Sequence, residues 1–373
     1  MLSRLNELEK LKLELFTNGM KLTSRAKQAI NEGMNIPEEI RLAHDIKNQP
    51  LTLAEFASTS GIPLRLGLSD IWVNTPIPEF NPNFVNDTSY QLEFDGDQFT
   101  LISLMSEVRV HPVPVPLYHG SVNSRGIPYT NFTVTHVDRA RTSPIDGCSF
   151  SCGFCDSSLT PYSTRDVEEI ISSLNVAISD PVLPARHILI SGGTPRKSDY
   201  VYELEVYQRV CESFKDFDVD IMMSPRPGLL DNLEEIHDFG VNAIYMNLEL
   251  FNDELAKQII PHKADISKKY YLELLAQAAP IFGKGNVRSL LLVGLEPMED
   301  TLNGVQALAE IGCDPILSPF RPSPKTPLSY ISPSTTEQLA EVWIKSKEIV
   351  SDYSGVEMGP RCSPCHHNTL TFP

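Results

Sequence analysis

Five of the seven cysteines in this 373-residue chain fall into two short clusters. Cys148, Cys152 and Cys155 form the first cluster, with the spacing C-x3-C-x2-C, and Cys362 and Cys365 form the second, with the spacing C-x2-C. Clustered thiols in a reducing compartment indicate metal or redox chemistry and not disulfides. The two clusters are therefore the first candidates for chemistry in this sequence.

The first cluster follows a strand-like run and lies in the segment 145–155. Three thiolates at this spacing can coordinate three irons of a cubic iron–sulfur cluster, whereas a four-iron cluster normally takes four cysteines. The fourth iron is then open, and an open metal position can hold a substrate. A structural zinc site is the alternative, but it needs four closed ligands, and neither His136 nor His187 is spaced like the missing one.

The second cluster lies in the segment Cys362–His367, which reads C-S-P-C-H-H. This pattern is found in both zinc and iron–sulfur sites. Three interpretations stay open: an auxiliary iron–sulfur cluster with further ligands from Cys313, a histidine or the substrate; a zinc site; or thiols that bind nothing. We expect this tail to fold back over the open mouth of the preceding domain. Cys211 lies in a helical pattern and is expected in the core.

Alternating strands and helices must position the first cluster. From about Phe132 onward, strand-like and helix-like runs alternate with short joins, which is typical of parallel β/α units. The expected strands are 132–140, 186–193, 218–225, 241–250, 287–295 and 314–320. The expected helices include 165–179, 202–214, 228–240, 299–312 and 335–350. Six units predict a partial (β/α)6 TIM-type barrel, in which chemistry belongs at the C-terminal ends of the strands.

The first 130 residues have a different pattern, and we expect them to form an N-terminal helical and β-hairpin extension. An apolar helical stripe is expected from the leucines at 2, 5, 8, 11 and 15. Further helices are expected to begin at Pro37 and near 52–56, a hairpin around Asp95–Asp97, and an extended Pro-rich connector at 111–120. The leucine stripe either packs on the barrel or binds a partner protein. The predicted domains are 1–130 (extension), 131–350 (barrel) and 351–373 (a C-terminal tail with cysteines).

Composition narrows the class of partner. The hydrophobic fraction of 41% and charged fraction of 21% are those of a globular protein, and the net charge is −17. Such a charge repels phosphate backbones, so we expect neither general nucleic-acid binding nor docking on anionic membranes. No apolar run approaches the ~20 residues that cross a bilayer. Glu7 and Glu9 interrupt what would be an export signal, so a cytoplasmic location is expected.

The cysteine pattern after the first strand resembles that of the radical S-adenosylmethionine (SAM) superfamily, and the resemblance extends over about residues 132–328. It implies a [4Fe-4S] cluster on Cys148, Cys152 and Cys155 whose open iron chelates SAM. One electron then cleaves SAM to a 5′-deoxyadenosyl radical, which abstracts hydrogen from a small-molecule substrate. An alternative of another class is a non-catalytic iron–sulfur scaffold or electron carrier.

The resemblance also implies roles for residues near the strand ends. Gly192, Gly193 and Thr194 match the family's GGE motif, which meets the SAM amino group, although Thr194 stands where glutamate is usual. Phe154 matches an aromatic position near the adenine.

Two later segments are similar to the branch of biotin synthase, HydE and PylB. Asn247 and Glu249 resemble its N-x-D/E motif, whose side chains hold the SAM ribose. Gly294 and Glu296 lie in what looks like its glycine motif beside the adenine, and 318–328 is similar to its P-x-x-x-T-P-L ending.

The branch suggests two reactions. One is sulfur insertion of the biotin or lipoyl synthase kind, with an auxiliary cluster on Cys362 and Cys365; the other is a carbon-skeleton mutase or lyase reaction without a second cluster. The family takes electrons from reduced ferredoxin or flavodoxin.

Arginines complete the sequence-based expectations. Because ferredoxins and flavodoxins are acidic, we expect a basic surface patch near the first cluster, formed by Arg139, Arg141 and Arg165. Three further arginines are expected to bind carboxylates at the top of the barrel. They are Arg226, Arg288 and Arg321.

Overall fold

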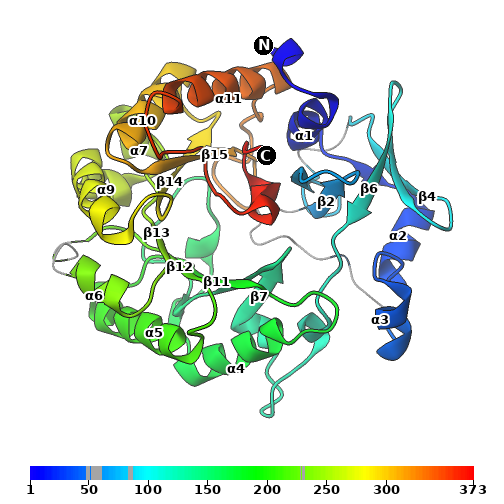
Figure 1. Cartoon of the computed structure of the whole chain (residues 1–373), viewed down its shortest axis with the longest axis horizontal. Helices are drawn as coiled ribbons and strands as arrows, with labels where there is room; N and C mark the ends of the chain where they lie inside the picture. Colours follow the sequence, from blue (N-terminus) through cyan, green and yellow to red (C-terminus); the bar gives the residue numbers. More distant parts are fainter. Residues whose placement is uncertain (48–50, 52–60, 83–86, 227, 229–231) are drawn as a thin grey trace.

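The computed structural model describes residues 1–47, 51, 61–82, 87–226, 228 and 232–373. A curved sheet with helices on its outer side forms the larger part, an N-terminal sheet lies beside it, and the C-terminal tail runs between the two (Figure 1). The helix expected at 52–56 lies outside the described residues.

The curved sheet holds six parallel strands in chain order, which confirms the partial (β/α)6 barrel. They are β8 (Arg139–Thr142), β11 (His187–Ser191), β12 (Val219–Met222), β13 (Ala243–Tyr245), β14 (Val287–Val293) and β15 (Asp314–Pro319). The expectation of a single first strand over 132–140 is wrong. β7 (Thr133–His136) runs antiparallel to β8, and the chain turns between them at Val137, whose φ is 57°.

Side chains of the parallel strands alternate between two environments, as the pleat requires. One set packs outward against the helices; it includes Ala140, Ile188, Ile190, Ile221, Ile244 and Leu317. The other set faces a cavity inside the barrel; it includes Arg139, Arg141, Leu189, Met222, Tyr245, Leu290 and Ile316. The barrel interior is therefore where polar chemistry can take place.

The helices between these strands cover the outer face of the sheet (Figure 1). They are α4 (Val167–Ile178), α5 (Tyr200–Ser213), α6 (Leu233–Asp238), α7 (Asp253–Ile259), α8 (Pro261–Ile266), α9 (Lys268–Phe282), α10 (Met298–Glu310) and α11 (Thr336–Val350). α4, α6 and α11 lie in expected runs, and α5 and α10 overlap theirs but begin one or two residues earlier. α7 to α9 join β13 to β14 where no element was expected. None of the helices in the described part of the chain is long and apolar enough to span a membrane.

Local sequence explains where the helices begin. The side chain of Asp166 accepts a hydrogen bond from Glu168 N at the start of α4. Thr335 and Gln338 form a capping box at the start of α11, each side chain bonding the other's backbone N–H. Such caps satisfy amide groups that have no partner within the helix.

The N-terminal part contains more strands than the sequence pattern predicted. Its sheet has the order β1-β4-β5-β6-β2-β3. The strands are β1 (Lys21–Leu22), β2 (Ile62–Leu66), β3 (Trp72–Thr75), β4 (Gln91–Phe94), β5 (Phe99–Ile102) and β6 (Glu107–Pro112). β4 and β5 form the expected hairpin. β2 and β3 were missed because strands of four or five residues show too few alternations to be recognised.

The helices of this part partly match expectation. α3 (Glu38–Ala43) follows Pro37 as predicted, and α2 (Ser24–Asn31) was not foreseen. The Pro-rich segment is extended through Pro116, but Leu117–Gly120 forms a 3-10 turn, so that end of the prediction is wrong. Proline bars helical geometry for the residue before it, and this restriction ends after the last proline.

The leucine stripe packs within the chain. The short 3-10 turn η1 (Leu2–Arg4) leads into α1 (Glu7–Asn18), and α1 contacts α11 and β3. Leu5, Leu11 and Leu15 are buried, and Leu2 and Leu8 pack against the same core. The hypothesis that this stripe binds a partner protein is therefore wrong, because its apolar face is already covered.

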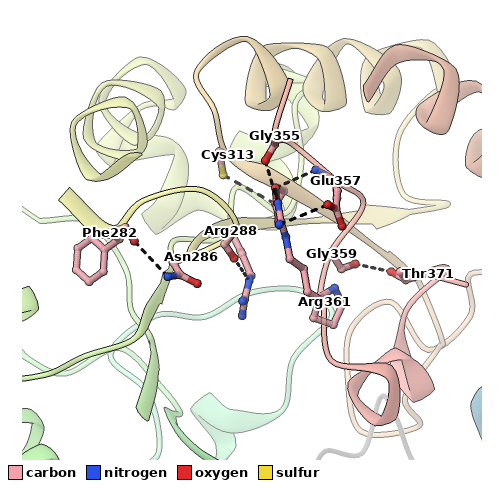
Figure 2. A network of polar contacts seen from close by, with 12 residues as sticks. Phe282, Asn286, Arg288, Cys313, Gly355, Glu357, Gly359, Arg361 and Thr371 are labelled. Atoms are coloured by element: carbon pink, nitrogen blue, oxygen red, sulfur yellow. Dashed lines mark hydrogen bonds and ion pairs between the residues drawn. The ribbon is translucent and has the colours of Figure 1, made fainter. Parts of the chain in front are cut away.

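The C-terminal tail is fastened to β15. Leu370 N donates to Leu317 O at 2.8 Å, so the tail covers the edge of that strand. Arg361 donates from Nε to Asp314 Oδ2 at 2.8 Å, and Arg361 Nη2 bonds Gly355 O at 2.9 Å. Figure 2 shows this network together with Glu357, whose backbone N–H donates to Asp314 Oδ1 at 3.0 Å.

Candidate active site

The first cysteine cluster lies on a loop closed by its own short hairpin. The loop leaves β9 (Ile145–Asp146) and returns at β10 (Ser163–Thr164), and these two strands pair antiparallel. Arg165 donates two hydrogen bonds to Asp146 Oδ1, from Nε at 3.0 Å and from Nη2 at 2.6 Å. This two-stranded hairpin holds the three thiols at the C-terminal end of β8, which is where the active-site residues of a β/α barrel are expected.

The surroundings of the thiols fit a metal centre. Cys148 Sγ accepts hydrogen bonds from Thr194 N at 3.1 Å and from Phe150 N at 3.3 Å, which stabilise a thiolate. Burial raises the pKa of Cys152 to about 12 and also raises the pKa of Cys155. A cation bound by these thiols would displace their protons and leave thiolate ligands.

The two glycines after β11 let that strand end pack directly on the cysteine loop. A Cβ on Gly193 would lie 1.9 Å from Gly147 O and 2.7 Å from Cys148 Cα. A Cβ on Gly192 would lie 2.1 Å from Ser143 Oγ. Only glycine fits at either position, so part of the reason for this Gly-Gly pair is steric.

Most of the residues selected from the sequence line one small cavity beside the thiols. They are Cys148, Cys152, Phe154, Cys155, Gly192, Gly193, Thr194, Asn247 and Glu249. These residues come from loops after β8 and β11 and from the chain following β13. Their convergence follows from parallel strands ending at the same edge of the sheet.

Gly294 and Glu296 do not join them. They line a separate cavity with Ser334. The Glu296 carboxylate accepts hydrogen bonds from Phe251 N and Asn252 N, both at 2.8 Å, so it holds the loop before α7. The expected contact of these two residues with the adenine is therefore not supported by where they lie, because β14 carries them past the shared cavity.

Lys263, on α8, completes the site and was missed. Its Nζ donates to Glu249 Oε1 and to Asn247 O, both at 2.9 Å. Burial alone would lower the pKa of Lys263, but the adjacent carboxylate of Glu249 raises it overall, so the lysine is charged. No sequence signal links the two, since a lysine on a short helix is usually exposed.

A larger cavity continues from this site into the barrel. Phe154, Cys155, Asn247 and Glu249 line both cavities, and the larger one extends to Cys365 in the tail. Arg139 and Arg141 point into it. The expected basic surface patch is thus wrong: these two arginines share the inward face of β8 because they are two residues apart, and Arg165 is paired with Asp146.

The three arginines expected at the top of the barrel have partners within the chain. Arg226 forms a buried ion pair with Glu203. Arg288 pairs with Asp220 at 3.1 Å, and it lies at the opposite end of the barrel because it is the second residue of β14. Arg321 lines the larger cavity and donates to Asn368 Oδ1 at 3.2 Å. Arg226 and Arg288 therefore do not fit the prediction that they bind a ligand carboxylate at the top of the barrel.

The tail cysteines also lie away from the barrel mouth. Cys365 Sγ is 3.4 Å from Nε2 of His187, the first residue of β11. The two tail cysteines therefore lie near the N-terminal ends of the strands, so the expectation that they fold over the mouth is wrong. Cys211 and Cys313 are buried in the core, as expected for Cys211; Cys313 contributes nothing to the tail cluster.

Comparisons with known proteins agree with this geometry. The family model of the Radical SAM superfamily matches residues 142–320. The chain is 29% identical over 129 residues to bacteriochlorophyllide c C-7(1)-hydroxylase of Chlorobaculum limnaeum. That match covers 34% of this chain and 32% of the relative, so the chain spans about a third of its length.

Two solved structures are also similar. A radical SAM methyltransferase from Sphaerobacter thermophilus has a TM-score of 0.45 at 13% identity, over 76% of this chain and 81% of that one. The FeFe-hydrogenase maturase HydG from Carboxydothermus hydrogenoformans has a TM-score of 0.47 at 15% identity, over 60% of this chain and 54% of that one.

Proposed function

The chain belongs to the radical SAM superfamily through residues 142–320, and from this we propose that it cleaves SAM beside Cys148, Cys152 and Cys155. The radical formed there takes a hydrogen atom from a small anionic molecule bound in the barrel cavity. The observation that carries the proposal is the single cavity lined by the three thiols, the Gly-Gly pair, Asn247 and Glu249.

The residues of that cavity have distinct roles in the proposal. When bound, a [4Fe-4S] cluster supplies an open iron for the amino and carboxylate groups of SAM and the electron for its cleavage. Lys263 donates to Glu249 Oε1, which leaves Glu249 Oε2 to accept from the ribose hydroxyls. Asn247 Nδ2, now 3.3 Å from the weak acceptor Met222 Sδ, turns to a ribose oxygen. Phe154 packs against the adenine.

The charge of the larger cavity supports an anionic substrate. Arg141 and Arg321 line it, and its carboxylate, Glu249, is neutralised by Lys263. A cationic interior in a chain with a net charge of −17 favours a carboxylate or phosphate group on the substrate. The apolar walls, which include Leu189, Leu290 and Leu292, exclude water from a reactive carbon radical.

The proposed reaction begins with the reduction of SAM and leads to a substrate radical. One electron from a reduced carrier of the ferredoxin or flavodoxin class breaks the S–C5′ bond of SAM, and methionine leaves. The 5′-deoxyadenosyl radical then takes a hydrogen atom from a substrate C–H bond and becomes 5′-deoxyadenosine. The substrate radical that remains is the starting point for rearrangement, cleavage or sulfur insertion. Sulfur insertion depends on an auxiliary cluster at Cys362 and Cys365 and stays a prediction.

The test is production of 5′-deoxyadenosine. Reconstitute the wild-type chain anaerobically, measure iron and sulfide, add dithionite and SAM, and quantify 5′-deoxyadenosine and methionine. We expect equal amounts of both from wild type and neither from a Cys148→Ala variant. Cys211→Ser is the matched control, because Cys211 is a buried thiol outside the site. A fully loaded protein that forms no 5′-deoxyadenosine would be a scaffold or electron carrier, which contradicts the proposal.

The substrate class has its own test. Small molecules extracted from the native host are separated on an anion exchanger, and each fraction is added to the SAM-cleavage assay. We expect the fraction that stimulates 5′-deoxyadenosine formation to be retained on the column. Arg141→Gln should raise the concentration of that fraction needed for half-maximal rate more than it lowers the basal cleavage rate. Stimulation by the unretained neutral or cationic fraction alone would overturn the assignment.

A further inference from the structure

Four potential metal ligands meet at the end of the barrel cavity opposite to the cysteine loop. The ligand atoms of Asp138, His187, Cys362 and Cys365 all lie within 4.8 Å of one another. We propose that they bind one divalent metal ion of the zinc class, in a closed site that joins the C-terminal tail to the barrel.

Three separate parts of the chain build this site. Asp138 lies in the turn between β7 and β8, and His187 is the first residue of β11. Cys362 precedes and Cys365 lies within the 3-10 turn η8 (Ser363–Asn368), where Cys365 N donates to Cys362 O at 3.0 Å. This tight turn brings the two thiols to the same side, toward the starts of β8 and β11.

The spacing of the ligand atoms favours a single ion. Ligands 2.0–2.3 Å from a tetrahedral ion are separated from one another by about 3.3–3.8 Å. Cys365 Sγ lies 3.4 Å from His187 Nε2, and the ligand atoms of all four residues lie within 4.8 Å of one another. An iron–sulfur cluster holds its terminal ligands on different irons, which spreads them more widely. Among the described residues, this group converges closely enough for one ion, and the three cysteines of the first loop do not form such a group.

The charge and burial of these ligand side chains also favour a bound cation. Asp138 Oδ1 is buried and has no hydrogen-bond partner among the described residues, which is costly for a carboxylate. Two thiolates, one carboxylate and a divalent ion leave one net negative charge. Arg139 Nη1, 3.8 Å from Cys365 Sγ, balances it.

The two histidines beside Cys365 are not ligands. His366 Nε2 lies 2.7 Å from Pro360 O, and His367 Nδ1 lies 2.7 Å from Pro364 O. They hold the fold of the tail, and the histidine ligand comes instead from β11. The C-x2-C-H-H pattern therefore contributes its cysteines alone to the proposed site.

Four protein ligands with no open position make a structural site and not a catalytic one. Its effect on function is to close the end of the substrate cavity. Cys365 and Asn368 both line that cavity, and Asn368 Oδ1 accepts from Arg321 at 3.2 Å. A metal ion that fixes the turn η8 thus also fixes Asn368, and through Asn368 the position of Arg321 in the cavity.

The first experiment uses the wild-type protein as isolated. Elemental analysis should find one zinc per chain in addition to iron. X-ray absorption at the zinc edge should show two sulfur neighbours at about 2.3 Å and two nitrogen or oxygen neighbours at about 2.0–2.1 Å. A protein without zinc, or with zinc surrounded by oxygen alone, overturns the proposal. Neither measurement depends on SAM cleavage, so failure here is distinct from failure of the proposed function.

Variants then locate the ion. Cys148→Ala/Cys152→Ala/Cys155→Ala should lose iron and keep zinc, whereas Cys362→Ser/Cys365→Ser should lose zinc. His187→Gln should release zinc to a chelator at least tenfold faster than wild type, and the control His237→Gln, at a partly exposed histidine of α6, should not. In the triple variant, cobalt should give the intense visible absorption of a tetrahedral thiolate site. Iron with acid-labile sulfide in that variant would instead identify an auxiliary cluster and overturn the zinc assignment.

Discussion

Cys155 and Cys365 line the same cavity from opposite ends of the barrel. Cys155 lies in the loop that follows β8, while Cys365 contacts His187, the first residue of β11. The five residues of β11 separate these two levels by about 13 Å at 3.3 Å per residue. The tail thiols therefore cannot complete the first cluster, and the space between the two sites is the cavity that we propose for the substrate.

Gly193→Ala should prevent assembly of the cysteine loop. Its Cβ would meet Gly147 O at 1.9 Å, a backbone atom that cannot move without shifting Cys148. We expect most of the iron bound after reconstitution to be lost, with a loss of about 1–3 kcal/mol in the free energy of unfolding. Gly120→Ala is the matched control, because a Cβ there meets no atom within 4 Å. Full iron loading of Gly193→Ala would show that the loop tolerates the shift.

Lys263→Met should destabilise the fold by leaving Glu249 buried without a counter-charge. Removing one partner of such a pair costs about 3–5 kcal/mol, measured by urea unfolding. Adding Glu249→Gln to this variant should recover much of the loss, but SAM affinity should stay low. Lys257→Met is the control, since the Lys257–Glu254 pair is exposed and should contribute little to stability. Equal effects of the two lysine variants would contradict the role given to Lys263.

Arg361→Met should loosen the tail. Asp314 is completely buried, and Arg361 pairs with it at 2.8 Å. Because Arg361 is itself about one-third exposed, we expect a loss of about 2–3 kcal/mol, less than for a fully buried pair. Limited proteolysis should cut the tail faster in this variant. Arg4→Met, which removes the exposed pair with Glu348, should leave both readouts unchanged; a tail equally resistant in Arg361→Met would contradict the anchor.

His119 should make the protein less stable in acid. Burial lowers the pKa of His119 to about 4 from the ordinary value of 6.5, and its Nε2 accepts from Thr135 N at 3.2 Å. Between pH 6.5 and 4 the unfolded chain binds a proton that the folded chain does not, so stability falls as the pH falls through this window. The loss from this group at pH 5 is about 2 kcal/mol.

The matched variant for this effect is His119→Gln, which can accept the same hydrogen bond and does not titrate. Urea unfolding at pH 7 and pH 5 should show a smaller drop for the variant than for wild type. Parallel pH dependence of the two proteins would show that His119 is protonated in the fold. Other titrating groups are common to both proteins and cancel in the comparison.

The sequence alone determined the β/α order of the barrel and the grouping of the three cysteines of the first loop. Both depend on short-range patterns: strand and helix periods repeat within a few residues, and three cysteines within eight positions share one loop. The same local character explains the error at 132–140, because one continuous strand-like run hides a reversal at Val137.

Only the tertiary structure decided which distant residues meet. Lys263 reaches Glu249 because α8 packs over the end of β13, and His187 and Asp138 reach Cys365 because the tail runs past the starts of β8 and β11. Arg139 and Arg141, which we expected on the surface, line a cavity in the folded chain. Lys263 and Glu249 are 14 residues apart in the chain, and His187 and Cys365 are 178 apart. Local periodicity contains no information about the packing that brings either pair together.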